Sequence, residues 1–205
     1  MATLDADRVR ANLAEVREEV GPDVEILAAT KYLALDEIAA LARAGVTLAG
    51  ENRAQDLEDK AAAHPELTWD FIGQLQSRKV RQILPHVRYV HSVASDSALR
   101  ELGKHGTPDT RVLVEVNVAE EPRKAGILPG ELPAFLERCP VEVVGLMTMP
   151  PYVEDPEDSR RWFAALRELA ARHGLRELSM GTTQDYAVAA QEGATIVRIG
   201  SRLYA

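Results

Sequence analysis

Eight short apolar segments alternate with helical segments along the chain, and this alternation limits the possible folds more than any other feature. The apolar segments lie at residues 24–29, 46–50, 69–73, 87–91, 111–118, 141–147, 176–180 and 195–199. Between them the spacing of apolar residues predicts helices at 35–44, 53–63, 76–84, 95–104, 130–138, 156–173 and 184–192. Strands that alternate with helices form parallel sheets, and right-handed crossovers close eight such units into a barrel.

A further helical segment precedes the first predicted strand and ends at Gly21-Pro22. Its apolar residues recur at helical spacing, at Leu4, Val9, Leu13, Val16 and Val20. Only six residues follow the eighth predicted strand, too few for a full-length outer helix, so we expect the N-terminal helix to cover that gap. The sequence therefore predicts an α/β fold, a single-domain (β/α)8 TIM-type barrel over residues 1–205 with an extra N-terminal helix.

The alternative fold is an open, doubly wound sheet with helices on both faces. A dinucleotide-binding sheet of that kind carries Gly-x-Gly-x-x-Gly after its first strand. Here the first predicted strand is followed by Thr30 and Lys31, and this fingerprint is missing. The barrel is therefore the favoured fold.

Composition and charge argue against several classes of protein. The 205 residues are 46% hydrophobic, enough for one core, and the net charge of -8 disfavours binding to nucleic acid or to anionic membranes. Cys139 is the only cysteine, the five histidines lack metal-ligand spacing, and no apolar run approaches the ~18 residues of a membrane span. We therefore expect a cytoplasmic monomer with no metal, nucleic-acid or membrane partner.

A lysine stands where the first predicted strand meets the mouth of the barrel. Lys31 directly follows the apolar and small residues 26–30, at the strand end where barrels carry their reactive groups. Loss of solvent there would lower the pKa of the amine and leave it neutral, the form that attacks an aldehyde. The alternative is a lysine that extends past the strand end into solvent.

Small residues and hydroxyls follow the seventh and eighth predicted strands, where barrels commonly bind a phosphate group. They are Ser179, Gly181, Thr182 and Thr183 from the seventh strand, and Arg198, Gly200 and Ser201 from the eighth. The alternative is two ordinary loops whose glycines serve tight turns. After the second predicted strand, Asn52 and Gln55 could hydrogen-bond a ligand or cap the next helix.

Short motifs in a recognisable order run along nearly the whole chain. They are Ala28–Lys31, Gly50–Gln55, Phe71–Lys79, Val90–Val93, Val116–Val118 with Lys124–Gly126, Gly145–Met147, Leu178–Gly181 and Val197–Ser201. In this order and spacing they resemble the pyridoxal phosphate homeostasis protein family, single-domain relatives of the N-terminal barrel of alanine racemase. The resemblance implies a protein that binds pyridoxal 5'-phosphate (PLP).

The resemblance also implies a role for each candidate residue. Lys31 would hold PLP as a Schiff base, and Arg198 would face its pyridine nitrogen. The other residues expected to bind the cofactor, most of them around its phosphate, are Asn52, Ser179, Gly181, Thr183, Gly200 and Ser201. A permanently charged arginine keeps the ring nitrogen unprotonated and weakens the ring as an electron sink, so demanding catalysis is disfavoured.

The sequence departs from the family pattern at two places. Arg78 stands where the family usually has asparagine, and the family usually has Met-Ser, an acidic or amide residue and Asp where this chain has 182–185. Thr183 can still donate a hydroxyl to a phosphate. Relatives that racemise alanine use a tyrosine from a C-terminal domain, and we expect that second acid/base group to be absent here.

Three functions stay open at this point. The first and favoured one is PLP homeostasis, in which the protein binds PLP reversibly, has PLP-dependent apo-enzymes as candidate acceptors and has no catalytic residue of its own. The second is a slow PLP-dependent amino-acid racemase or a related enzyme. The third is a phosphosugar isomerase without an aldehyde cofactor. It would bind a phosphate at the same place, the loops after the seventh and eighth predicted strands, which we call the phosphate corner.

Overall fold

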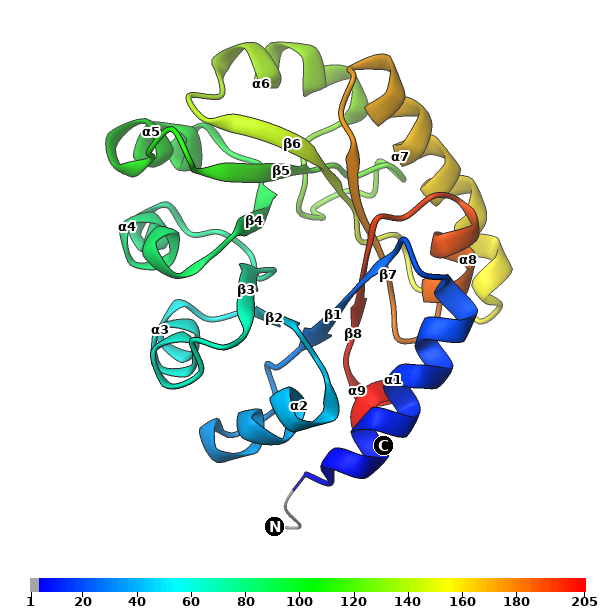
Figure 1. Ribbon diagram of the computed structural model, residues 1–205. Helices are drawn as coiled ribbons and strands as arrows, with labels where there is room; N and C mark the ends of the chain where they lie inside the picture. The colour runs from blue at the N-terminus through cyan, green and yellow to red at the C-terminus, as the bar shows by residue number, and fades with distance from the viewer. Residues whose placement is uncertain (1–3) are drawn as a thin grey trace.

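The computed structural model describes residues 4–205, which form a closed barrel of eight parallel strands (Figure 1). The strands are β1 (Glu25–Ala29), β2 (Leu48–Glu51), β3 (Thr68–Phe71), β4 (Tyr89–Val93), β5 (Arg111–Glu115), β6 (Glu142–Met147), β7 (Glu177–Thr182) and β8 (Ile196–Ile199). They pair in sequence order, and β8 closes on β1, where Leu27 lies beside Arg198. The predicted barrel is confirmed.

The helices lie outside the barrel and alternate with the strands (Figure 1). The α-helices are α1 (Ala6–Val20), α2 (Ile38–Ala44), α3 (Ala54–Ala63), α4 (Val80–Ile83), α5 (Asp96–His105), α6 (Leu132–Arg138), α7 (Arg160–Arg172), α8 (Tyr186–Gln191) and α9 (Ser201–Tyr204). The 3-10 helices are η1 (Leu35–Glu37), η2 (Ser77–Lys79), η3 (Leu84–His86), η4 (Pro129–Glu131) and η5 (Pro156–Ser159). Each longer helix buries one apolar stripe, which in α7 is formed by Phe163, Leu166, Leu169 and Ala170.

The N-terminal helix α1 covers the side of the barrel where a full-length outer helix would follow β8. Asp5 caps its start by accepting a hydrogen bond from the N–H of Asp7 at 2.9 Å, and Gly21, with φ +83°, ends it. The helix contacts α2, α8 and the short α9 (Figure 1). Asn12 Nδ2 donates to the carbonyl of Leu203 at 3.1 Å and joins α1 to α9. The expected position of this helix is confirmed.

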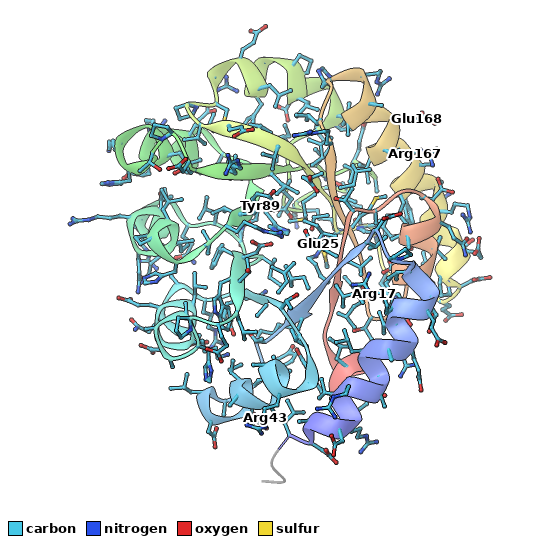
Figure 2. The ribbon with its side chains drawn as sticks, in the orientation of Figure 1. Arg17, Glu25, Arg43, Tyr89, Arg167 and Glu168 are labelled. Carbon is cyan, nitrogen blue, oxygen red and sulfur yellow. The ribbon has the colours of Figure 1, made fainter. Side chains whose placement is uncertain are left out.

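The barrel has a large apolar core outside its strands and a small one inside. The inner cluster consists of Leu27, Leu48 and Ile196. A Cβ at Gly50 would lie 2.4 Å from Leu27 Cδ2, so glycine there makes room for the inner leucine. Buried polar side chains, among them Asp70, His91 and Arg198, fill other parts of the interior. Glu25 and Tyr89, labelled near the centre of Figure 2, are the first residues of β1 and β4, and Glu25 is exposed.

Most elements differ from their predicted bounds by one or a few residues, as three of them illustrate. The helix predicted at 76–84 is divided into η2, α4 and η3, and α4 ends before Pro85, which lacks the N–H that would continue it. The strand predicted at 87–91 starts two residues later, at Tyr89. The strand predicted at 111–118 ends at Glu115, after which Asn117 donates its N–H to the carbonyl of Ile127 at 2.9 Å and the chain turns.

Candidate functional site

The eight candidate residues lie on four strands that are neighbours in the closed sheet. The order of these strands around the barrel is β7, β8, β1, β2. The candidates are Lys31 after β1, Asn52 after β2, Ser179 and Gly181 within β7, Thr183 after it, Arg198 within β8, and Gly200 and Ser201 after it. Because the carboxyl ends of parallel strands meet on one face, these residues gather at one mouth of the barrel.

Lys31 stands at the rim of the mouth and is exposed to solvent. Buried Thr30 joins the end of β1 to β2, because its N–H donates to the carbonyl of Gly50 at 2.9 Å. The N–H of Leu33 donates to the carbonyl of Thr30 at 2.9 Å, and in the resulting turn Lys31 Nζ lies 4.8 Å from the centre of the Tyr32 ring. The expected burial of this lysine is therefore wrong, because the strand ends before it.

Gly200 lies between the loop after β7 and the end of β1, and a small side chain there would meet both in ordinary van der Waals contact. A Cβ at Gly200 would have Thr183 Oγ1 at 3.9 Å and Ala29 Cβ at 4.0 Å as its nearest neighbours. The N–H of Gly200 donates to Thr183 Oγ1 at 3.1 Å, and exposed Ser201 begins α9. Small residues and hydroxyls thus line a space that adjoins the strand leading to Lys31.

The loop after β7 is held in a tight turn. Asp185 Oδ1 accepts hydrogen bonds from the N–H of Thr182 at 2.7 Å and from its hydroxyl at 3.1 Å. Gly181 has φ +87°, a left-handed conformation, and a Cβ there would lie 2.5 Å from Ala189 Cβ. The turn itself therefore requires glycine at 181, and a contact between Gly181 and a phosphate stays a prediction.

Asn52 carries a buried acceptor that the protein does not satisfy. Within residues 4–205 no donor reaches its Oδ1. The N-cap residue of α3 is Arg53, and no side chain caps this helix, so the interpretation of Asn52 as a helix cap is wrong. A buried amide oxygen without a donor is rare in proteins, and it fits a group that a ligand brings to the site.

Arg198 lies inside the barrel and is 6% exposed. Its Nη1 donates to Ser179 Oγ at 2.5 Å and its Nη2 to the carbonyl of Thr148 at 2.9 Å. Burial lowers the pKa of Arg198 to about 10, although the charges of Asp185 and Glu115 oppose this shift. The guanidinium is therefore still charged at neutral pH.

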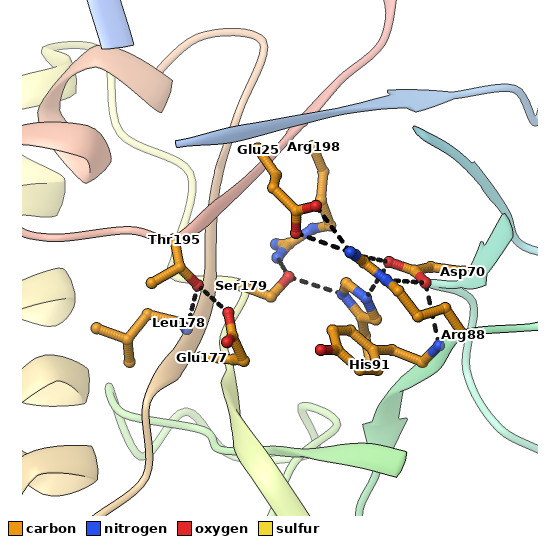
Figure 3. A network of polar contacts seen from close by, with 10 residues as sticks. Glu25, Asp70, Arg88, His91, Glu177, Leu178, Ser179, Thr195 and Arg198 are labelled. Atoms are coloured by element: carbon orange, nitrogen blue, oxygen red, sulfur yellow. Dashed lines mark hydrogen bonds and ion pairs between the residues drawn. The ribbon is translucent and has the colours of Figure 1, made fainter. Parts of the chain in front are cut away.

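Ser179 joins Arg198 to a histidine across the barrel (Figure 3). Its Oγ lies 2.8 Å from Nδ1 of His91 on β4, and Nε2 of His91 lies 3.1 Å from Oδ2 of Asp70 on β3. Ser179 is fully buried, and its hydroxyl is committed to these two neighbours. The side chain of Ser179 therefore points into the barrel, and a contact between Ser179 and a phosphate stays a prediction.

Sequence reasoning missed His91 and Asp70, since it considered the histidines only as possible metal ligands. Burial lowers the pKa of His91, although the hydrogen bond and charge of Asp70 oppose this, so the ring is neutral at pH 7. Burial acts to raise the pKa of Asp70, but hydrogen bonds and charges from His91 and Arg88 outweigh it and lower the pKa. The available signal was one acidic or basic side chain within each of two strands, Asp70 in β3 and His91 in β4.

Glu115 adds an acidic group inside the barrel, at the end of β5. Glu115 pairs with Met147 and Met147 pairs with Ser179 in the sheet, and neighbours in such a row point to the same side. Glu115 is 8% exposed. Burial raises the pKa of Glu115, although the charges of Arg198 and Lys124 oppose this shift.

Two other features are absent from the part of the chain that the structure describes. Across residues 4–205, no group of three or more His, Cys, Asp and Glu side chains is placed to hold a metal ion. None of the helices in this range is long and apolar enough to cross a membrane.

Comparison with known sequences gives a match over almost the whole chain. The model of the alanine racemase N-terminal domain family matches residues 4–205. A protein of Aquifex aeolicus named pyridoxal phosphate homeostasis protein is 39% identical over 195 residues, which cover 88% of this chain and 86% of the relative. A protein of the same name from Deinococcus radiodurans is 38% identical over 208 residues, which cover 96% of this chain and 98% of the relative.

Comparison with solved structures gives the same barrel. PipY of Synechococcus elongatus, solved with PLP bound, has a TM-score of 0.81 at 30% identity and covers 96% of this chain and 100% of its own. The alanine racemase of Corynebacterium glutamicum has a TM-score of 0.81 at 15% identity, and the match covers 98% of this chain and 62% of the racemase. The likeness to the racemase is therefore one of fold alone.

Proposed function

The chain belongs to the pyridoxal phosphate homeostasis protein family, and on that premise we propose that it binds PLP reversibly at the barrel mouth and takes part in PLP homeostasis. The observation that carries the proposal is the position of Gly200, where the missing side chain leaves room for a Cβ atom without a clash. It lies between the hydroxyl of Thr183 and Ala29, two residues before Lys31. A phosphate group in that space would adjoin the strand that ends at the candidate amine.

The residues around the mouth fit the chemical groups of PLP. Ser201 and Thr183 offer N–H and hydroxyl donors to a phosphate, and the N–H of Gly200, which donates to Thr183 Oγ1, orients the Thr183 hydroxyl. The unsatisfied Oδ1 of Asn52 offers an acceptor to the ring hydroxyl. When bound, PLP supplies an aldehyde that condenses with a primary amine, and Lys31 would form this Schiff base. The whole barrel would then act as one cofactor-binding domain.

The charge on Arg198 favours a protein that binds and releases the cofactor over one that uses it for catalysis. Its guanidinium cannot give up its proton readily at neutral pH, so a ring nitrogen facing it would stay unprotonated. The exposed amine of Lys31 can be reached from solvent, which suits reversible loading and release. PLP-dependent apo-enzymes are the candidate acceptors.

The proposal is tested by titrating the purified protein with PLP while recording the visible absorbance. We expect a new band that saturates at one PLP per chain, and borohydride treatment followed by peptide mapping should place the label on Lys31. Lys31→Ala should remove the band and leave the circular dichroism spectrum unchanged.

Lys104→Ala is the matched control, since Lys104 is 63% exposed and lies on α5, away from the mouth. It should bind PLP like the wild type. Label spread over several lysines, or an unchanged band in Lys31→Ala, would overturn the assignment.

A further inference from the structure

The hydrogen-bonded chain that joins Arg198 to Asp70 continues to the opposite end of the barrel (Figure 3). Arg88 Nη2 donates to Asp70 Oδ2 at 2.8 Å, and Arg88 Nη1 donates to Glu25 Oε1 at 2.7 Å. Glu25 is the first residue of β1 and Arg88 directly precedes β4, so this ion pair lies at the amino ends of the strands. Polar contacts therefore run through the barrel from that end to the mouth.

The donors and acceptors in this series of hydrogen bonds determine which group donates in each of them. Ionised Asp70 also accepts from Arg88 Nε at 3.2 Å and has no proton to give. Neutral His91 therefore donates from Nε2 to Asp70, and its Nδ1 accepts the proton of the Ser179 hydroxyl. With that proton committed, Ser179 Oγ presents only lone pairs to Arg198 Nη1.

An Asp, His and Ser in this order also occur in hydrolases, where the serine attacks the substrate. Here Ser179 and His91 are both 0% exposed, so no substrate carbonyl can reach the hydroxyl. The serine oxygen instead accepts a hydrogen bond from the guanidinium of Arg198, which is buried and has few contacts with solvent. Anchored by Ser179 on one Nη and by the carbonyl of Thr148 on the other, Arg198 keeps one orientation.

We propose that Asp70, His91 and Ser179 are positioning residues that hold Arg198 in the orientation needed to face a ring nitrogen at the mouth. Arg88 supports this hold from the far end, because it fixes the Asp70 carboxylate on which His91 depends. The identity of the ring as that of PLP rests on the proposed function. The orientation of Arg198 does not, so the two can be tested separately.

The first test uses the ligand-free protein labelled with nitrogen-15. At pH 7 the NMR signals of His91 should show a proton on Nε2 and none on Nδ1, and the Nη protons of Arg198 should appear as separate, slowly exchanging signals. Ser179→Ala should shift His91 Nδ1 and average the Arg198 signals, while Ser179→Thr, which keeps a hydroxyl, should restore them. Ser159→Ala is the matched control, since Ser159 is a buried serine with no hydrogen-bond partner within residues 4–205.

The second test measures PLP binding and the wavelength of its visible band in the same variants. Ser179→Ala should raise the Kd about tenfold, as expected for losing a hydrogen bond to a charged group, and should shift the band. Arg88→Gln should shift the band in the same direction by less. Arg111→Gln should have no effect, because Arg111 also starts a strand but pairs only with exposed Glu142.

The outcomes distinguish the two proposals. Wild-type protein that fails to bind PLP would reject the proposed function, and the NMR result would still decide the positioning role. A His91 proton on Nδ1, or Arg198 signals unchanged in Ser179→Ala, would overturn the positioning role even if PLP binds. An unchanged band and Kd in Ser179→Ala would do the same.

Discussion

Lys60 Nζ lies 2.5 Å from Glu51 Oε1, and this ion pair is buried between α3 and β2. Lys60 also donates to the carbonyl of Thr30 at 2.9 Å, and Glu51 Oε2 accepts from the N–H of Asn52 at 2.7 Å. One ion pair thus holds the ends of both strands that lead to Lys31 and Asn52.

Removal of one partner of this ion pair should destabilise the protein strongly. Lys60→Met leaves the Glu51 carboxylate buried without a counter-charge, for which we expect a loss of about 3–5 kcal/mol in the free energy of unfolding. Glu51→Gln combined with Lys60→Met should recover part of it, because no unpaired charge then stays buried. Urea denaturation measures both, and a loss below about 1 kcal/mol in the single variant would contradict the prediction.

A methyl group at position 200 should block the phosphate corner. The side chain of Gly200→Ala would occupy the space between Thr183 and Ala29, so we expect PLP affinity to fall at least about tenfold, as when a ligand loses well-placed donors. Gly130→Ala is the control, because a Cβ at Gly130 meets nothing within 4 Å and so also fits without a clash, but it lies in η4, away from the corner. Equal PLP affinities of the two variants, measured by absorbance titration, would contradict the proposal that the phosphate of PLP binds beside Gly200.

The buried histidine should make the fold sensitive to mild acid. The pKa of His91 is lowered from 6.5 in the folded state, so the unfolded chain binds the proton first as the pH falls. The stability contributed by neutral His91 is therefore complete above about pH 6.5 and is lost as the pH falls below it. The melting temperature should therefore fall as the pH is lowered from 8 to 5. In His91→Gln the melting temperature should depend less on pH over this range.

The buried carboxyl group of Glu115 should cost stability at neutral pH. Its pKa is raised above 4.5 in the folded state, so the cost appears as the pH rises above that value. Glu115→Gln should stabilise the protein by roughly 1 kcal/mol at pH 7 and by less at pH 4. Glu142→Gln, which changes an exposed carboxylate on the neighbouring strand, should not reproduce this pattern of unfolding free energies.

Amino-acid turnover should be slow. Tyr32 and Tyr152 are 85% and 79% exposed, and the hydroxyl of partly buried Tyr204 donates to the carbonyl of Ala29 at 3.0 Å, so none is an obvious second proton-transfer group. Missing one such group costs about 10²- to 10⁴-fold, so α-hydrogen exchange of alanine in deuterated water should fall far below ~10 per second. Inversion of alanine at ordinary enzymatic rates, lost in Lys31→Ala, would instead identify a racemase.

The barrel could be predicted from the sequence because each buried parallel strand is a short apolar run between helices. For the same reason the sequence does not show which side chains contact one another inside the barrel. A strand buried on both faces shows no alternation that separates inward from outward residues. Ser179 therefore looked like a loop donor, although it faces His91, which lies 88 positions earlier in the chain.

The position of Lys31 shows a second limit of sequence reasoning. The sequence placed it correctly at the end of β1, but its exposure depends on one turn. That turn is set by hydrogen bonds of Thr30 to Gly50 and to Leu33, which involve backbone groups that carry no sequence signature. Asn52 was ambiguous for the same reason, since only the structure shows that Arg53 is the N-cap residue of α3.

The polar chain through the barrel also bears on how this fold could be engineered. Breaking one buried ion pair is costly, but replacing a whole set of buried polar groups with well-packed apolar residues is often neutral or stabilising. A barrel redesigned with an apolar interior from Glu25 to Arg198 is therefore expected to be at least as heat-resistant as the natural one. It would have no fixed cation at its mouth, and a search for thermostable variants would select against the arrangement that orients Arg198.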